Sequence, residues 1–166
     1  MAVFGTRPEA IKMAPVVKEL IRRSSEGRIV PSVCVTGQHR EILDQVLHVF
    51  NIVPDYDLDL MTHGQSLLQL AARALHNLEP ILNKVKPDWV IVQGDTTTAA
   101  IAALAAYYTG TKVAHVEAGL RTYDKWQPFP EEINRRIAGV VSDMHFAPTA
   151  AARQNLLNEG VSPHAV

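Results

Sequence analysis

The 166-residue sequence has little of what marks a secreted, membrane-spanning or nucleic-acid-binding protein. Its single cysteine, Cys34, allows no disulfide within the chain, so a reducing compartment is expected. Its longest apolar stretch, residues 99–108, is about half the length of a membrane-spanning helix. The 16 Lys and Arg residues against 17 Asp and Glu residues give a formal net charge of -1. Nucleic acids and anionic membranes favour a concentrated positive field, so neither is expected as a partner.

Targeting and cofactor motifs are also missing. The first four residues run directly into Gly5 without the basic start and long apolar core of a signal peptide, so a cytoplasmic location is expected. The sequence has no GxGxxG dinucleotide fingerprint, P-loop lysine pattern, HExxH motif, paired cysteines or GxSxG nucleophile elbow. We therefore expect neither a cofactor nor a metal.

What the sequence does contain is an alternation of short β-branched runs with longer helical patterns. Strands are predicted at residues 1–4, 29–36, 89–93, 113–117 and 145–148. Helices are predicted at residues 8–23, 42–50, 67–86, 97–108, 131–140 and from a Thr149 cap to Gly160. Pro15 should bend or restart the first helix, and residues 51–65 are interpreted as an irregular connection. The alternation predicts an α/β fold with a doubly wound, Rossmann-like parallel sheet.

Ligands of such sheets bind at the carboxyl ends of the strands, so the residues that follow each strand are the first candidates. After the first strand, Arg7 could hold a phosphate by two parallel hydrogen bonds, although an ordinary turn with a surface arginine fits equally well. After residues 89–93, Asp95 could cap the next helix. The adjacent threonines can serve as caps instead, which favours a functional carboxylate.

The predicted strand at residues 113–117 and the helix after it hold further candidates. Strand alternation predicts that His115 and Glu117 point to the same side, with Glu117 a candidate acid or base at the strand end. A lone histidine such as His115 is more often a satisfied buried residue. Glu131 and Arg135 are four residues apart on a helix, which fits both a surface salt bridge and a carboxylate held toward a ligand.

Five segments occur together in a distinctive order: residues 5–12 (GTRPEAIK), 38–40 (QHR), 94–98 (GDTTT), 115–122 (HVEAGLRT) and 130–135 (PEEINR). In order and spacing they resemble the non-hydrolysing UDP-N-acetylglucosamine 2-epimerases, and the resemblance covers essentially the whole chain. Each motif alone is modest, whereas five in register are highly specific.

The resemblance implies that residues 1–166 are the N-terminal, Rossmann-like half of a GT-B-like two-domain enzyme, whose C-terminal domain is absent from this chain. The family interconverts UDP-N-acetylglucosamine and UDP-N-acetylmannosamine for bacterial surface polysaccharides. UDP is eliminated across C1–C2 to give a 2-acetamidoglucal and is added back after the proton returns on the opposite face. The isolated half should be inactive, because half of the cleft is missing.

The resemblance also implies roles for individual residues, all still to be tested. The acid/base set would be Asp95, Glu117 and Glu131, with the order of proton transfers open. The substrate-binding set would be Arg7, Lys12, Arg135 and His115. A second UDP-N-acetylglucosamine would act as an allosteric activator near Gln38, His39 and Arg40. The full-length enzyme would be a homodimer.

Two alternatives remain open at this level. One is half of a hydrolysing epimerase or of another GT-B sugar-nucleotide enzyme, against which the intact segment 5–12 argues. The other is a non-catalytic module that binds nucleotide sugars, against which the retention of all three carboxylates argues.

Overall fold

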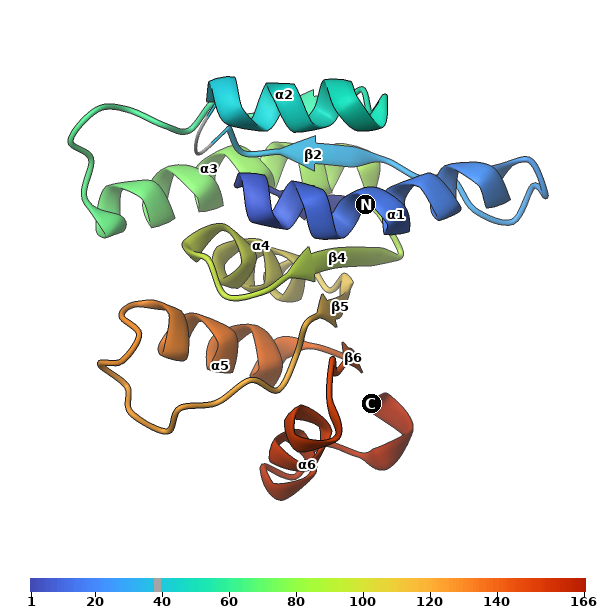
Figure 1. Cartoon of the computed structure of the whole chain (residues 1–166). Coiled ribbons are helices and arrows are strands. Elements are labelled where there is room, and N and C mark those ends of the chain that lie inside the picture. Colours follow the sequence, from blue (N-terminus) through green and yellow to red (C-terminus); the bar gives the residue numbers. More distant parts are fainter. Residues whose placement is uncertain (38–39) are drawn as a thin grey trace.

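The computed structural model describes residues 1–37 and 40–166 and contains a six-stranded parallel sheet flanked by helices (Figure 1). Across the sheet the strand order is β3-β2-β1-β4-β5-β6. The strands are β1 (Ala2–Phe4), β2 (Val33–Val35), β3 (Tyr56–Asp57), β4 (Trp89–Gln93), β5 (Lys112–Val116) and β6 (Met144–Phe146). The helices are α1 (Arg7–Ser24), α2 (Arg40–Phe50), α3 (Leu67–Val85), α4 (Thr97–Tyr108), α5 (Glu131–Val141), α6 (Ala150–Asn158) and the 3-10 turn η1 (Pro163–Ala165). This order confirms the predicted doubly wound, Rossmann-like fold.

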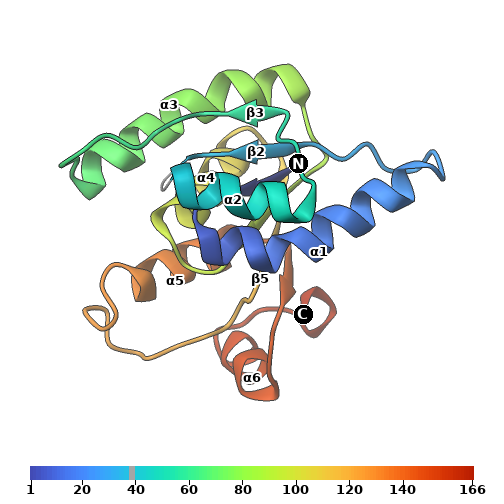
Figure 2. The same cartoon turned by 45° about the horizontal axis from the view of Figure 1, so that its top comes forward.

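Alternate residues of the strands pack against different helices. Ala2 and Phe4 of β1 lie in one apolar cluster with residues of α1 and α2. Val3 and Cys34 lie in a second cluster with residues of α3, α4 and α5. Figure 2 shows α1 and α2 on one side of the strands and α3 and α4 on the other. The central strands are therefore covered on both faces, which explains their nearly continuous apolar sequences.

The second strand is shorter than the sequence predicts. Of the predicted residues 29–36, only Val33–Val35 form β2. The register pairs Ala2 with Val33, so the ladder with β1 begins there. Pro31 has no amide hydrogen to donate to a ladder, which also disfavours an earlier start.

Two other expectations are wrong in detail. Residues 51–65 were expected to be irregular, but Tyr56 and Asp57 form β3, which pairs in parallel with Cys34 and Val35. Pro15 was expected to bend or restart the first helix; α1 runs through it as one element, so the helix does not restart there. Burial of the apolar face of α1 against the sheet outweighs the single hydrogen bond that the proline removes.

Candidate active site

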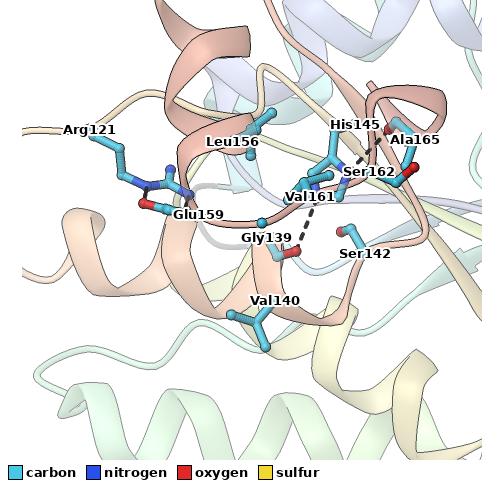
Figure 3. Close-up of a pocket in the computed structure, with 11 residues that line it drawn as sticks. Arg121, Gly139, Val140, Ser142, His145, Leu156, Glu159, Val161, Ser162 and Ala165 are labelled. Atoms are coloured by element: carbon cyan, nitrogen blue, oxygen red, sulfur yellow. Dashed lines mark hydrogen bonds and ion pairs between the residues drawn. The ribbon is translucent and has the colours of Figure 1, made fainter.

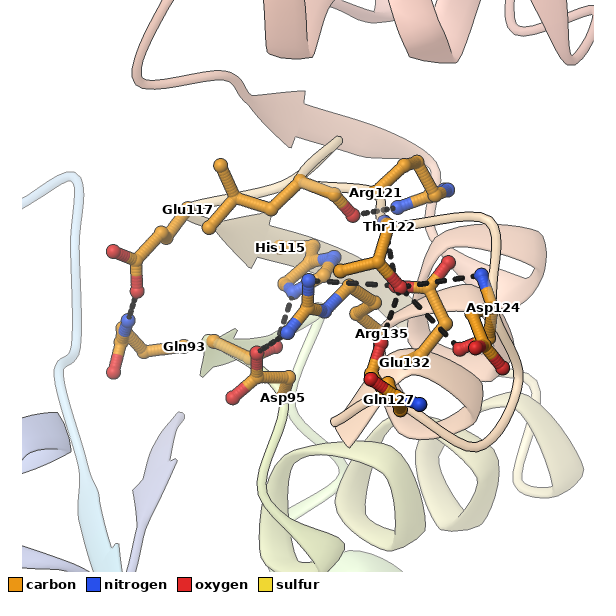
Figure 4. A network of polar contacts seen from close by, with 12 residues as sticks. Gln93, Asp95, His115, Glu117, Arg121, Thr122, Asp124, Gln127, Glu132 and Arg135 are labelled. Atoms are coloured by element: carbon orange, nitrogen blue, oxygen red, sulfur yellow. Dashed lines mark hydrogen bonds and ion pairs between the residues drawn. The ribbon is translucent and has the colours of Figure 1, made fainter. Parts of the chain in front are cut away.

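The carboxyl ends of β1, β4 and β5 meet the start of α5 at one edge of the sheet. These three strands are neighbours and parallel, so the turns after them lie side by side. The turns carry Arg7, Asp95 and Glu117. Figure 4 shows Asp95 joined to Arg135, and Glu117 joined to Gln93 beside them. The fold thus brings together side chains that the sequence motifs single out separately.

Glu117 lies at the end of β5 in a strained backbone conformation. Its φ of 66° is in the left-handed region, which costs about 1–3 kcal/mol for a residue other than glycine. The Lys12 Nζ donates to both carboxylate oxygens, at 2.7 Å to Oε1 and 2.6 Å to Oε2. The Gln93 amide also donates to Oε2 (Figure 4). The carboxylate is therefore oriented by α1 and β4 as well as by its own strand.

The expected shared direction of His115 and Glu117 assumed that both residues belong to the strand. β5 ends at Val116, and the left-handed φ of Glu117 places that residue outside the regular strand alternation. His115 is fully buried, whereas the Glu117 side chain is 26% exposed and reaches Lys12.

Asp95 is held by Arg135 and does not cap a helix. Thr96 caps α4, because its hydroxyl accepts from the Ala99 amide at 3.1 Å. The Arg135 Nη2 donates to the Asp95 Oδ2 at 2.5 Å. Burial raises the pKa of Asp95 above its usual value, Arg135 opposes that rise, and the nearby Glu131 and Glu117 charges add to it. Asp95 thus lies in the field of both other predicted carboxylates.

Glu131 opens α5 and is partly exposed. The salt bridge that its spacing from Arg135 allows is not formed, since the Arg135 guanidinium contacts Asp95 and Glu132. Within residues 1–37 and 40–166, no hydrogen bond or salt bridge is found for Glu131. The sequence motifs gave Glu132 no role in the site, although its spacing of three residues from Arg135 could have indicated the contact.

His115 lies beneath the turn that carries Asp95. Its Nε2 is 2.7 Å from the Gly94 carbonyl oxygen, which can only accept, so Nε2 carries the proton. Burial lowers the pKa of His115 to about 4, and the imidazole is therefore neutral near pH 7. A neutral, fully buried ring offers no cation to a phosphate. This geometry favours a supporting role under Asp95 over direct contact with a ligand.

The low pKa of His115 predicts loss of stability in acid. The folded pKa of about 4 lies below the usual 6.5, so the unfolded chain takes up the proton first as the pH falls. The free energy of unfolding should fall between about pH 6.5 and pH 4 by roughly 3 kcal/mol and then level off. Urea unfolding of wild type and His115→Gln across this range measures the effect. Equal pH dependence in the two proteins would contradict it.

Glu9 is a buried carboxylate that sequence reasoning missed. It accepts from the Gly5 and Thr6 amides at 2.9 Å and 2.7 Å, and from the Thr96 hydroxyl at 2.6 Å. Burial raises its pKa above the usual value. These bonds join the turn that precedes Arg7 to the turn that carries Asp95. Arg7 itself is exposed at the first position of α1.

A separate pocket of about 370 Å³ lies between α5, α6 and η1 (Figure 3). Arg121 lines one side of the pocket, and its guanidinium donates to both carboxylate oxygens of Glu159, at 2.8 Å from Nε and 2.7 Å from Nη2. His145 lines another side, and its ring nitrogens face the carbonyls of Gly139 and Ala165 at 3.0 Å and 3.3 Å. The lining residues do not include Asp95, Glu117 or Glu131. This pocket is therefore distinct from the carboxylate cluster.

Gln38 and His39 lie outside the described residues, as does the side chain of Arg40, so the structure gives no geometry for that candidate effector site.

In the part of the chain that the structure describes, no group of three or more His, Cys, Asp and Glu residues could hold a metal ion. Over the same residues, no helix is long and apolar enough to cross a membrane.

Comparison with known proteins gives a consistent result. The family model described as UDP-N-acetylglucosamine 2-epimerase matches residues 22–166. The UDP-N-acetylglucosamine 2-epimerase of Escherichia coli K12 is 54% identical over 162 residues, which are 98% of this chain and 42% of that protein. That of Campylobacter jejuni is 52% identical over 160 residues, 96% of this chain and 41% of that protein. The chain therefore spans less than half the length of these relatives.

Solved structures give the same match. The UDP-GlcNAc 2-epimerase from Neisseria meningitidis bound to UDP-GlcNAc superposes with a TM-score of 0.95 at 51% identity, over 99% of this chain and 44% of that one. The Methanocaldococcus jannaschii enzyme in complex with UDP-GlcNAc and UDP has a TM-score of 0.91 at 36% identity, with coverage of 99% and 44%.

Proposed function

The chain belongs to the UDP-N-acetylglucosamine 2-epimerase family, and from this premise we propose that it forms the N-terminal, catalytic half of a non-hydrolysing epimerase. The longer enzyme would interconvert UDP-N-acetylglucosamine and UDP-N-acetylmannosamine in a cleft between this domain and a second one. The length of the relatives supports the two-domain arrangement, since the chain covers only 42% of the E. coli protein.

One observation carries the proposal: at one end of the sheet, Asp95 lies within the electrostatic range of both Glu117 and Glu131. Glu131 and Glu117 both raise the pKa of Asp95, so their charges lie close enough to interact. Lys12 and Arg135 lie among them as counter-charges. Such a cluster supplies groups that can take up and release protons, together with cations suited to an anionic leaving group.

This combination fits a reaction by elimination and re-addition. A carboxylate removes the proton from C2 of the sugar while the bond from C1 to the diphosphate oxygen breaks. The electron pair of the C–H bond forms a C1=C2 double bond, which gives 2-acetamidoglucal and UDP. A protonated carboxyl group then returns a proton to C2 on the opposite face, and a diphosphate oxygen re-forms the bond to C1. Asp95, Glu117 and Glu131 are the proposed proton carriers.

The proposed cations are Arg7, Lys12 and Arg135. Arg7 is exposed at the N-terminus of α1, where backbone amides and the helix dipole also favour an anion. The Lys12 side chain is 47% exposed and that of Arg135 10% exposed, and each forms an ion pair with a carboxylate. A diphosphate entering here would share these cations, and UDP would be retained for re-addition rather than released.

The proposal is tested with a chimera that joins this chain to the part of the E. coli K12 relative beyond the matched region. We expect the chimera to convert UDP-N-acetylglucosamine to UDP-N-acetylmannosamine without accumulating free UDP. The 166-residue chain alone should show no sustained conversion, because it lacks the other side of the cleft. Free UDP formed in step with free sugar would indicate a hydrolysing enzyme, and a folded chimera without conversion would refute the proposal.

Three further expectations stay predictions. They are activation by a second UDP-N-acetylglucosamine near residues 38–40, a homodimer of the longer chain, and a cytoplasmic location.

A further inference from the structure

Glu132 is a fully buried carboxylate next to the proposed catalytic set. Its Oε1 accepts from the Tyr123 amide at 3.1 Å. Its Oε2 accepts from the Thr122 amide at 3.1 Å and lies 3.4 Å from the Arg135 Nη1. All three partners are donors, so the site requires a group that accepts on both oxygens. An ionised carboxylate meets that requirement, and the Arg135 guanidinium compensates its buried charge.

Arg135 is fixed at two of its nitrogens by two different carboxylates. Nη1 faces Glu132 and Nη2 faces Asp95. Because the guanidinium is planar, contacts at two nitrogens set the plane of the group as well as its position. Without Glu132, Asp95 would hold the guanidinium at one nitrogen only. Figure 4 shows Arg135 between these two carboxylates.

Glu132 also fixes the backbone that leads from Glu117 to α5. Its bonds to the Thr122 and Tyr123 amides tie that segment to the first turn of the helix that carries Glu131. One buried side chain is therefore connected to all three proposed proton carriers: to Asp95 through Arg135, to Glu131 through α5, and to Glu117 through residues 118–121.

We propose that Glu132 is a positioning residue that holds the Arg135 guanidinium in the plane that meets Asp95. The inference rests on the proposed function, because Arg135 matters there as the counter-charge of a proton carrier and of the diphosphate. The competing explanation is that Glu132 only fastens the segment of Thr122 and Tyr123 to α5.

A second side chain, Asn155, forms hydrogen bonds with the same segment between Glu117 and α5, and it provides a matched control. Asn155 of α6 donates to the Gly119 carbonyl at 3.0 Å and accepts from the Tyr123 hydroxyl at 2.9 Å. Neither bond involves Arg135. Asn155→Ala should therefore loosen the segment without releasing the guanidinium.

The test substitutes Glu132→Gln, which keeps the size of the side chain but turns one acceptor into an NH₂ group that must face a donor. In the 166-residue chain, we expect separate NMR signals from the two Arg135 NH₂ groups in wild type and Asn155→Ala, and averaged signals in Glu132→Gln. In the chimera, we expect kcat to fall by about 10²-fold in Glu132→Gln, with a much smaller change in KM. In Asn155→Ala, kcat should stay near that of wild type.

A folded Glu132→Gln variant with wild-type Arg135 signals and kcat would overturn the proposal, as would equal effects of the two variants. If Glu132→Gln does not fold, Glu132→Asp decides, since it keeps the charge but withdraws the carboxylate by one methylene. Averaged Arg135 signals in a folded Glu132→Asp would support positioning, and unchanged signals would refute it. An inactive wild-type chimera would count against the proposed function alone, because the NMR comparison needs no activity.

Discussion

Replacing Glu117 by glutamine in the chimera is expected to lower kcat for epimerisation by about 10²- to 10⁴-fold, the usual contribution of a positioned acid or base. The amide keeps the size of the side chain beside Lys12 and Gln93 but cannot carry a proton to or from C2 of the sugar. The measurement is the rate at which UDP-N-acetylmannosamine forms from UDP-N-acetylglucosamine. Incorporation of deuterium at C2 from heavy water gives a second readout of the same step.

The matched control is Glu19→Gln on the exposed face of α1. Glu19, like Glu117, is held by cationic side chains, in its case Arg22 and Arg23 at 2.7 Å each. Among the residues that the structure describes, Glu19 pairs only with these exposed arginines and does not contact the proposed proton carriers, so its replacement should not change kcat. A wild-type kcat in Glu117→Gln would exclude the proposed role. A raised KM with unchanged kcat would assign Glu117 to binding instead.

The sequence was sufficient for the parts of the site that depend on local rules. A doubly wound parallel sheet places the turns after its strands at one end of the sheet, and the predicted candidates Asp95 and Glu117 lie in two such turns, after the neighbouring strands β4 and β5. Capping chemistry was equally local. Thr96 rather than Asp95 caps α4, as the adjacent threonines suggested, and that leaves the carboxylate for Arg135.

The other features of the site and fold depend on contacts between residues that are distant in sequence. Arg135 could have paired with Glu131 by spacing, but the fold brings Asp95, 40 residues away, to 2.5 Å from its Nη2. The left-handed backbone of Glu117 follows from tertiary packing, since no local pattern favours it in a glutamate. The two-residue β3 exists because the exposed edge of β2 is available to pair, and its own sequence carries little strand signal.

The second large effect is expected from Gly119→Ala, measured as the free energy of urea unfolding of the 166-residue chain. Gly119 has a φ of 88°, and a Cβ there would lie 2.2 Å from the Ala152 carbonyl oxygen and 2.9 Å from the Leu156 Cγ. Strain of the left-handed backbone costs about 1–2 kcal/mol. Displacing the backbone of α6 adds about 1–3 kcal/mol. The total would be a substantial part of the stability of an average domain.

Gly160→Ala separates the two contributions, because Gly160 has nearly the same φ, 89°, and no atom lies within 4 Å of the position that a Cβ would take there. The free energy of unfolding of Gly160→Ala should fall only by the cost of the left-handed backbone, about 1–2 kcal/mol. Equal losses in the two variants would mean that α6 moves away from Gly119 at little cost. A larger loss at Gly119 would mean that close backbone contact, in addition to the Arg121–Glu159 salt bridge, fixes α6 against the segment that follows Glu117.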